Sequence, residues 1–322
     1  MSLCIIFGGA GFVGTHLAQH FLKSGRFSHV HIADIRETPL KGLPNISSSL
    51  TDVRLPINLD LPKRPDWIFH LAAIHREPGH EAEEYFETNI KGAETVCDFA
   101  ARVACPHIYF TSSIAVYGPC LTPTSEHSRL APTTPYGSSK LKSEELLSQW
   151  RAGSANRRLL ISRPGVIYGP GDPGNIMRMI KAIRKGYFAI PGSKNIHKSY
   201  AYIYGFIESV DFALDSRQQQ ITYNYVEHPT ETVGEITRII KNIFHSKAPI
   251  LSIPAPFLVT AATFLQFFLR QKSPVHPVRV RKAATPTHII PQVLLDMGFI
   301  FNFDFLSSIK HWQHVAPEDF EA

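Results

Sequence analysis

Short apolar segments alternate with amphipathic ones along the first half of the chain. The apolar segments are rich in Ile, Val, Leu and Phe and lack the alternation of a half-exposed strand, so they predict strands buried on both faces. We expect these strands at residues 3–8, 29–34, 66–73, 107–113 and 158–163. Helical periodicity predicts helices near residues 12–24, 83–104 and 135–151.

This alternation of strand and helix predicts an α/β fold, a doubly wound parallel sheet of the Rossmann type. After about residue 165 the pattern loosens into the loop GPGDPGN, a helix over 175–186, a strand over 221–226 and a helix over 231–245. We expect residues 1–165 to form the sheet domain. Residues 166–322 would form mainly a smaller lobe over the C-terminal edge of the sheet, where ligands bind in such folds, with some segments returning to the core.

Composition and charge narrow the function classes. The chain has 322 residues, of which 44% are hydrophobic, enough for a large buried core. The formal net charge is +6, but Lys and Arg are scattered, without the aromatic-interleaved basic block of nucleic-acid binders. The charge therefore favours a small anionic ligand and predicts no nucleic-acid partner.

Cysteine spacing and the N-terminal segment predict a cytoplasmic protein. The four cysteines have no CxxC spacing and stand in apolar or turn contexts, so we expect them to be reduced and structural: Cys4, Cys97, Cys105 and Cys120. No signal peptide is expected, because the chain enters an apolar strand without a basic leader. No metal site is expected either, because the loose pair His29 and His31 lacks a third ligand at a fitting spacing.

The longest uncharged run, residues 252–269, is short for a membrane span of roughly 20 apolar residues. Two prolines stand at its start and Gln266 interrupts its end, which favours a core-facing or interfacial helix. Arg270 and Lys272 follow directly and leave peripheral membrane contact open.

Three glycines follow the first predicted strand and open the first predicted helix. Gly8, Gly11 and Gly14 form the pattern GxxGxxG, which serves either a tight connection or a cradle for a phosphate. Asp34, at the end of the next strand, favours the cradle, because a carboxylate there can bind an adenosine ribose 2′-hydroxyl and would repel a 2′-phosphate. We therefore predict NAD rather than NADP as the cofactor, with Arg36 as the one feature against this choice.

A tyrosine and a lysine four residues apart offer a catalytic base. Tyr136 and Lys140 begin the helix predicted over 135–151, so their side chains share one face. The Lys140 ammonium would lower the phenol pKa from about 10, and the phenolate could take a hydroxyl proton while hydride leaves the same carbon. Ser112 and Ser113 end the preceding strand, where catalytic side chains lie in this fold.

Together these pieces resemble the extended short-chain dehydrogenase/reductase superfamily, in its nucleotide-sugar epimerase/dehydratase branch. The resemblance runs from about residue 3 to 310, through GGAGFVG, HLAA, NIKGAETV, TSSIAVYG, PYGSSK, RPGVIYGPGD and KSYAYI. It implies that Tyr136 is the general acid/base, that Lys140 holds the cofactor ribose and tunes Tyr136, and that Ser113 binds the reacting oxygen.

The resemblance also implies a set of NAD contacts. They fall on Gly8, Gly11, Phe12, Val13, Gly14, Asp34, Asp52, Val53, Leu71, Ala72, Ala73, Asn89, Tyr136, Lys140 and Pro164. By spacing alone, Asp52 could equally be a solvated carboxylate in a turn.

Two positions before Tyr117 bear on the reaction. Relatives that act as 4,6-dehydratases carry an acid/base carboxylate pair in place of Ile114 and Ala115, and 3,5-epimerase/reductases carry a Cys at Ala115, so both reactions would lack proton carriers here. What remains is reversible oxidation at one carbon. Either a transient 4-keto sugar turns over and is reduced on its other face, which is 4-epimerisation, or the protein is an NAD(P)-dependent 4-ketoreductase. Asp34 favours the epimerase, in surface-polysaccharide precursor synthesis, because biosynthetic reductases usually draw on NADPH.

A nucleotide-diphosphate hexose is the substrate that the resemblance implies, with contacts at Ser113, Lys198, Tyr200 and Arg281. Lys198 either replaces a phosphate-binding Arg or is a solvated surface charge. The basic cluster around Arg281 either binds the diphosphate of the substrate or is a solvated surface. Val166 departs from the branch, in which many members have an Asn that contacts the substrate. Glu126 is expected to have a conformational role.

Two further function classes stay open. A hydroxysteroid-type dehydrogenase shares the core motifs, and the apolar run at 252–269 favours it, whereas GPGDPGN and KSYAYI oppose it. A non-enzymatic NAD-sensing protein would have no chemical reason to keep Ser113, Tyr136 and Lys140 together.

The resemblance further implies a homodimer that pairs through the helices at 83–104 and 135–151.

Overall fold

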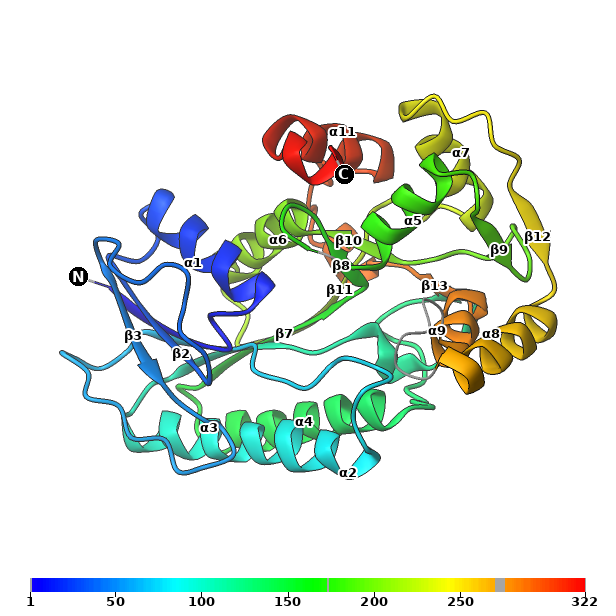
Figure 1. Cartoon of the computed structure of the whole chain (residues 1–322). Helices are drawn as coiled ribbons and strands as arrows, with labels where there is room; N and C mark the ends of the chain where they lie inside the picture. Colours follow the sequence, from blue (N-terminus) through cyan, green and yellow to red (C-terminus); the bar gives the residue numbers. More distant parts are fainter. Residues whose placement is uncertain (1, 173, 270–275, 322) are drawn as a thin grey trace.

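A seven-stranded parallel sheet forms the centre of the computed structural model, which describes residues 2–172, 174–269 and 276–321 (Figure 1). The strand order is β11-β7-β5-β4-β1-β2-β3, and every neighbouring pair is parallel. The strands are β1 (Leu3–Phe7), β2 (His29–Asp34), β3 (Ile46–Leu50), β4 (Trp67–His70), β5 (His107–Thr111), β7 (Arg158–Pro164) and β11 (Gln220–Tyr225). The predicted fold class is confirmed. The order reverses between β1 and β4, the point where ligands bind in doubly wound sheets.

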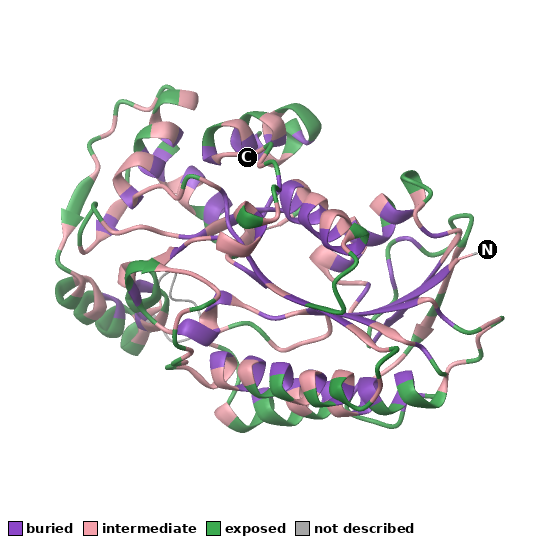
Figure 2. Cartoon of the chain, turned by 180° about the vertical axis from the view of Figure 1, so that it is seen from behind, coloured by how far each residue is buried: buried purple, intermediate pink, exposed green. Residues whose placement is uncertain are grey.

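Helices cover both faces of this sheet (Figure 1). One face packs against α1 (Phe12–Lys23) and α6 (Ile203–Asp215), the other against α3 (Lys91–Arg102) and α4 (Pro135–Ala152). Alternate residues of β1 belong to different cores, Ile6 to the first and Ile5 to the second. Because both faces of the central strands are buried, β1 and β4 are buried at every position, whereas the edge strand β3 is partly exposed. Figure 2 shows the central strands as mostly buried.

The second half of the chain builds a smaller set of elements and returns to the sheet at β11, which pairs with β7. Three parallel two-stranded pairs surround the carboxyl edge: β8 (Val166–Tyr168) with β10 (Tyr200–Tyr202), β9 (Ala189–Pro191) with β12 (Leu251–Ile253), and β6 (Cys120–Thr124) with β13 (Thr287–Ile289). The other helices are α5 (Asn175–Arg184), α7 (Val233–Ile243), α8 (Ala255–Leu269), α9 (Pro277–Ala284), α10 (Gln292–Asp296), α11 (Phe305–Val315) and the 3-10 turn η4 (Pro317–Phe320).

Two predicted elements of the first half have different bounds. The strand expected over 66–73 ends at His70, because the next residues leave the sheet and pack against the glycine turn. The single helix expected over 83–104 is divided into α2 (Ala82–Tyr85), a π-helical turn η1 (Phe86–Ile90) and α3. A π turn leaves the regular α hydrogen-bond pattern, and periodicity does not reveal it.

The apolar run at 252–269 was predicted to be a core-facing or an interfacial helix, and the structure contradicts the core-facing alternative. The run divides into the end of β12 and the helix α8, and α8 directs most of its phenylalanines to solvent. Among the described residues, no helix is long and apolar enough to cross a membrane.

A buried carboxylate makes the stability of the second half depend on pH. Glu227 is 4% exposed and accepts hydrogen bonds from Ser308 Oγ at 2.6 Å and from the Tyr168 hydroxyl. Burial raises its pKa from 4.5 to about 7. The folded state therefore holds the proton more tightly than the unfolded chain, so this stabilisation is complete below about pH 4.5 and is lost as the pH rises through 7.

The variant E227Q keeps the hydrogen-bond acceptor and removes the charge. We expect its free energy of unfolding to exceed that of the parent by about 2–3 kcal/mol at pH 8 and by less than about 1 kcal/mol at pH 5, because the ionised carboxylate is penalised only at the higher pH. Urea unfolding at both pH values measures the difference, with E83Q as the control at an exposed glutamate. An equal difference at pH 5 and pH 8 would contradict the assignment.

Candidate active site

The glycine turn lies between β1 and β4, where the strand order reverses. Gly8 has a φ of +80°, and a β-carbon there would lie 2.6 Å from the backbone nitrogen of Ala72. A β-carbon at Gly14 would lie 2.5 Å from Cα of Gly9. Both positions require glycine because backbone approaches backbone. At Gly11 a β-carbon would meet only the Gly8 carbonyl oxygen, at 3.2 Å, so the turn is open where α1 begins.

The start of α1 fits the diphosphate of a dinucleotide. Gly11 is the N-cap, no side chain caps the helix, and its first turn holds no acidic residue. The first amides and the positive end of the helix dipole therefore favour an anion at this point. Phe12 and Val13 form the first turn of the helix. These features together fit a cradle better than a purely structural connection.

Asp34 is fixed beside this cradle by two backbone amides. Its Oδ2 accepts a hydrogen bond from the Ala10 nitrogen at 3.0 Å, and its Oδ1 accepts one from the Arg36 nitrogen at 3.1 Å. The side chain is buried at the carboxyl end of β2. The carboxylate thus lies where a ribose hydroxyl of the cofactor would reach it, so the residues present fit NAD.

Other residues with predicted cofactor contacts have different local partners. Ala72 packs on Gly8, and Pro164 ends β7 at the same edge of the sheet. Asp52, in contrast, accepts two hydrogen bonds from Arg54, at 3.0 Å from Nε and at 2.6 Å from the terminal nitrogen. Val53 is buried and its carbonyl accepts the Thr95 hydroxyl. Contacts of these side chains with NAD stay predictions.

Asn89 braces the loop after β4 against the helix α4. Its Oδ1 accepts from the Ile74 nitrogen at 2.8 Å, and its Nδ2 donates to the Ile74 carbonyl at 3.1 Å and to Ser139 Oγ at 2.9 Å. The π turn η1 brings this buried amide to the interface. Both amide protons are used within the protein, so Asn89 acts here by holding the loop that contains Leu71, Ala72 and Ala73.

Ser113 and Tyr136 meet at the carboxyl end of β5. The helix α4 begins at Pro135, because the Thr134 side chain caps it by accepting from the Gly137 nitrogen at 3.1 Å. A β-carbon at Gly137 would lie 2.5 Å from the Ala115 carbonyl oxygen, so glycine lets α4 approach the 3-10 turn η2 (Ile114–Tyr117). Tyr136 and Ser113 are joined by a side-chain hydrogen bond.

Burial sets the electrostatics of the predicted catalytic pair. It raises the pKa of Tyr136 to about 12, opposed by the bond with Ser113 and reinforced by the charge of Glu77. Burial also lowers the pKa of Lys140 to about 7. Lys140 Nζ donates to the Thr111 carbonyl at 2.7 Å and lies 4.5 Å from the centre of the Phe110 ring.

The predicted lowering of the Tyr136 pKa by Lys140 is therefore not found in this arrangement. The ammonium is directed to Thr111, and the groups that shift the phenol are Ser113, Glu77 and Tyr85. Tyr85 lies close by, with its ring centre 6.3 Å from that of Tyr136.

A buried ion pair under the catalytic helix was not predicted from the sequence. Arg163, on β7, donates to Glu144, on α4, through Nε at 2.9 Å and through a terminal nitrogen at 2.6 Å. The Ser112 hydroxyl donates to the same carboxylate. The other terminal nitrogen of Arg163 donates to the Tyr117 hydroxyl at 2.8 Å. This network fixes α4 on the sheet. Glu144 stands four residues after Lys140, and that spacing was the available signal.

Glu126 has the conformational role that was expected. Its two carboxylate oxygens accept from the Asn224 nitrogen at 2.7 Å and from the Gln292 nitrogen at 3.1 Å. The loop that leads to α4 is thereby tied to the end of β11 and to α10.

Lys198 is half-buried and its ammonium is bound by backbone carbonyls, so the interpretation as a solvated surface charge is wrong. Its Nζ donates to the carbonyls of Lys282 at 2.9 Å and Thr285 at 2.7 Å, which caps the C-terminal end of α9. Burial lowers its pKa to about 8. Tyr200 lies on β10 beside Val166, whereas Arg281 is exposed on α9. Their contacts with a substrate stay predictions.

Glu77 connects α9 with Tyr136, the predicted catalytic tyrosine. Lys282, on α9, forms an ion pair with one oxygen of Glu77, and the other oxygen is buried without a hydrogen-bond partner. The charge of Glu77 contributes to the raised pKa of Tyr136. The basic helix α9 therefore borders the site. No local pattern predicts this pair, because its two members are far apart along the chain.

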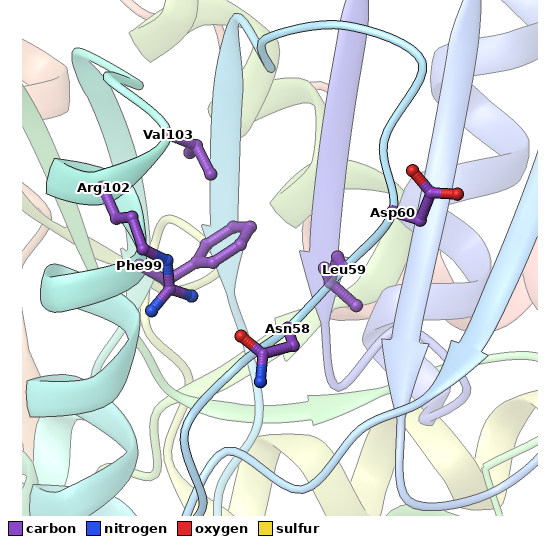
Figure 3. Close-up of a pocket in the computed structure, with 6 residues that line it drawn as sticks. All are labelled: Asn58, Leu59, Asp60, Phe99, Arg102 and Val103. Carbon is purple, nitrogen blue, oxygen red and sulfur yellow. The ribbon is translucent and has the colours of Figure 1, made fainter.

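Two other features lie outside this constellation. Figure 3 shows a hollow of about 420 Å³ lined by Asn58, Leu59, Asp60, Phe99, Arg102 and Val103. Arg102 and Val103 precede β5, so this hollow lies at the amino edge of the sheet, opposite the predicted catalytic residues.

His29 and His31 form hydrogen bonds with serine hydroxyls of β3. In the described part of the chain, no group of His, Cys, Asp or Glu could hold a metal ion.

A family model and a curated relative both match this chain. The model of the NAD dependent epimerase/dehydratase family matches residues 4–225. A protein of Escherichia coli O157:H7, N-acetyl-alpha-D-glucosaminyl-diphospho-ditrans,octacis-undecaprenol 4-epimerase, is 28% identical over 302 residues, which cover 92% of this chain and 89% of that protein.

Solved structures share the whole fold. UDP-glucuronic acid 4-epimerase from Bacillus cereus, in complex with UDP-glucuronic acid and NAD, has a TM-score of 0.76 at 19% identity and covers 98% of this chain and 99% of that one. ADP-L-glycero-D-manno-heptose-6-epimerase from Helicobacter pylori has a TM-score of 0.76 at 19% identity, covering 100% and 97%.

Proposed function

The chain belongs to the NAD dependent epimerase/dehydratase family, and on this premise we propose that it is a 4-epimerase of a hexose carried on a diphosphate. One observation carries the proposal. Tyr136, hydrogen-bonded with Ser113, stands at the carboxyl edge of the sheet, and the neighbouring positions Ile114 and Ala115 supply no second acid or base. Without an acid or base at these two positions, the site supports oxidation and reduction at one carbon rather than elimination of water.

In this proposal each residue acts on the C4 hydroxyl of the sugar. Bound NAD supplies the hydride acceptor and donor. Ser113 orients the sugar oxygen. Tyr136 takes the proton of this oxygen and returns it to the same oxygen after the 4-keto sugar has turned the opposite face of C4 toward the hydride donor. The buried network of Glu144 and Arg163 keeps α4, and with it Tyr136, in place.

A nucleotide-diphosphate hexose is the first substrate class to test. A second carrier, a polyprenyl diphosphate, is favoured by the relative from Escherichia coli O157:H7, whose name states an undecaprenyl-linked substrate and which matches nearly the full length of both chains. Both carriers present the same diphosphate and hexose to the site. The basic helix α9 beside Glu77 suits the diphosphate of either.

An NAD(P)-dependent 4-ketoreductase and a hydroxysteroid-type dehydrogenase are less well supported. The Asp34 carboxylate, held by Ala10 and Arg36, disfavours the 2′-phosphate of NADP. The apolar helix α8, which favoured a hydrophobic alcohol, directs its large side chains to solvent.

We further propose a homodimer that pairs through α3 and α4, in the cytoplasm, for this chain. Its four cysteines are buried and unpaired, and burial raises the pKa of each thiol, which suits a reducing compartment. Light scattering of the purified protein measures the assembly.

The proposed function is tested with protein purified without added cofactor. The protein is denatured, the released nicotinamide is assayed, and nucleotide hexoses and polyprenyl-diphosphate hexoses are screened by separating C4 isomers. Retained NAD with interconversion of C4 epimers supports the epimerase. A protein that turns over only with added NADH or NADPH and changes the substrate mass by two hydrogens is a reductase instead.

A further inference from the structure

The helix α8 directs its large apolar side chains away from the protein. Phe257, Phe264, Phe267 and Phe268 are between 64% and 77% exposed, whereas the polar Gln266 is half-buried. A helix on the surface of a globular protein normally directs its apolar side chains to the core and its polar side chains to water. Figure 2 shows most of α8 as exposed. Four exposed phenylalanines on one short helix indicate a binding surface.

The polar groups on this helix are satisfied within it. The Thr260 hydroxyl donates to the Pro256 carbonyl at 2.9 Å, and the Thr263 hydroxyl donates to the Val259 carbonyl at 2.8 Å. Hydroxyls bonded back to their own helix can enter an apolar medium at little cost. Between Phe257 and Phe268 the exposed side of α8 thus presents apolar side chains and two hydroxyls that are already hydrogen-bonded.

The chain around α8 is strongly basic. Between Glu235 and Asp296 the sequence contains no acidic residue, and it contains eight basic ones: Arg238, Lys241, Lys247, Arg270, Lys272, Arg279, Arg281 and Lys282. Of these, Arg279, Arg281 and Lys282 are exposed on α9, which packs against α8. Aromatic side chains beside cations, in a stretch of chain without acidic residues, complement a bilayer, whose interior is apolar and whose headgroups are anionic.

We propose that α8 and α9 form a docking face for an anionic phospholipid bilayer. The 15 residues of α8 extend roughly 22 Å, too short to span, so the helix lies in the plane of the membrane. Its phenylalanines enter the acyl boundary, and the cations of α9 meet the lipid phosphates. This docking does not depend on the proposed reaction.

The position of the face gives docking a consequence for the site. Lys282 of α9 pairs with Glu77, whose charge acts on Tyr136, so the docking face adjoins the catalytic edge of the sheet. α8 and α9 lie side by side at the end of the molecule opposite β3 (Figure 1). A bilayer on this face would bring a diphosphate-linked lipid near the catalytic edge, and a second copy of the chain there would bring like charges together.

Vesicle flotation of the full-length protein tests the docking face. The parent is expected to float with vesicles of phosphatidylcholine containing a third phosphatidylglycerol, and weakly with phosphatidylcholine alone or at high salt. F264S/F267S should weaken binding to the anionic vesicles about tenfold or more, because two aromatic anchors are lost. The control I300S/Y187S removes two side chains of similar exposure elsewhere and should bind as the parent does.

A second variant adds a signal instead of removing an anchor. The three native tryptophans, Trp67, Trp150 and Trp312, are buried, so F267W places the one solvent-exposed indole on α8. Its emission should shift to shorter wavelength on addition of anionic vesicles. A parent that stays unbound, equal binding by F264S/F267S, or an F267W emission that does not change would each overturn the proposal. So would a loss of self-association in F264S/F267S with unchanged vesicle binding, since a second copy would then cover the face.

Discussion

Replacing Tyr136 with Phe is expected to lower kcat for C4 epimerisation by about 10²–10⁴-fold, because the variant has no group to take and return the hydroxyl proton. NAD retention should be nearly unchanged, since the ring still packs beside Tyr85 and the glycine turn is untouched. The measurement is the initial rate of isomer formation, together with the nicotinamide released on denaturation.

The matched control for this variant is Y85F. The Tyr85 ring lies beside Tyr136, but its hydroxyl donates to the Arg76 carbonyl, away from the reaction. We expect this variant to keep turnover within a few-fold of the parent. A Y136F protein as active as Y85F would show that Tyr136 is not the acid/base.

The second large effect concerns stability. R163M removes the guanidinium and leaves the buried Glu144 carboxylate without its counter-charge, so we expect a loss of about 3–5 kcal/mol in the free energy of unfolding. The double variant E144M/R163M buries no charge and should recover at least half of this loss. Urea unfolding of the three proteins measures both values.

An exposed ion pair on the same helix serves as the control. K142M breaks the pair of Lys142 with Glu145, which lies at the surface, and should cost less than about 1 kcal/mol. If R163M were no more destabilising than K142M, the buried pair would not hold α4 in place.

The sheet and the glycine turn could be predicted because their signals are local. Strands such as β1 and β2 are buried on both faces. Short segments rich in apolar residues therefore predict them from the sequence. Gly8 and Gly14 are required by backbone contacts within the turn and with the loop after β4. The spacing of Tyr136 and Lys140 placed both residues on the first turns of α4, as the structure shows.

Interactions between distant segments could not be predicted in this way. The pairs Glu144 with Arg163 and Glu77 with Lys282 join elements whose proximity only the complete fold defines. The direction of the Lys140 ammonium could not be predicted for the same reason. It donates to the carbonyl of Thr111, at the end of β5, and only the complete fold brings β5 next to α4. For α8 the sequence has few polar residues and no charged one, so its periodicity did not show which side faces solvent.

The central claim is that one carbon is oxidised and then reduced within the same site. A hexose substrate labelled with deuterium at C4 tests it most directly, with protein purified without added cofactor in ordinary water. We expect the C4 epimer to form with the deuterium still at C4 and with no solvent hydrogen incorporated. A product that has lost the label, or a reaction that proceeds only with added NADH or NADPH, would contradict the account.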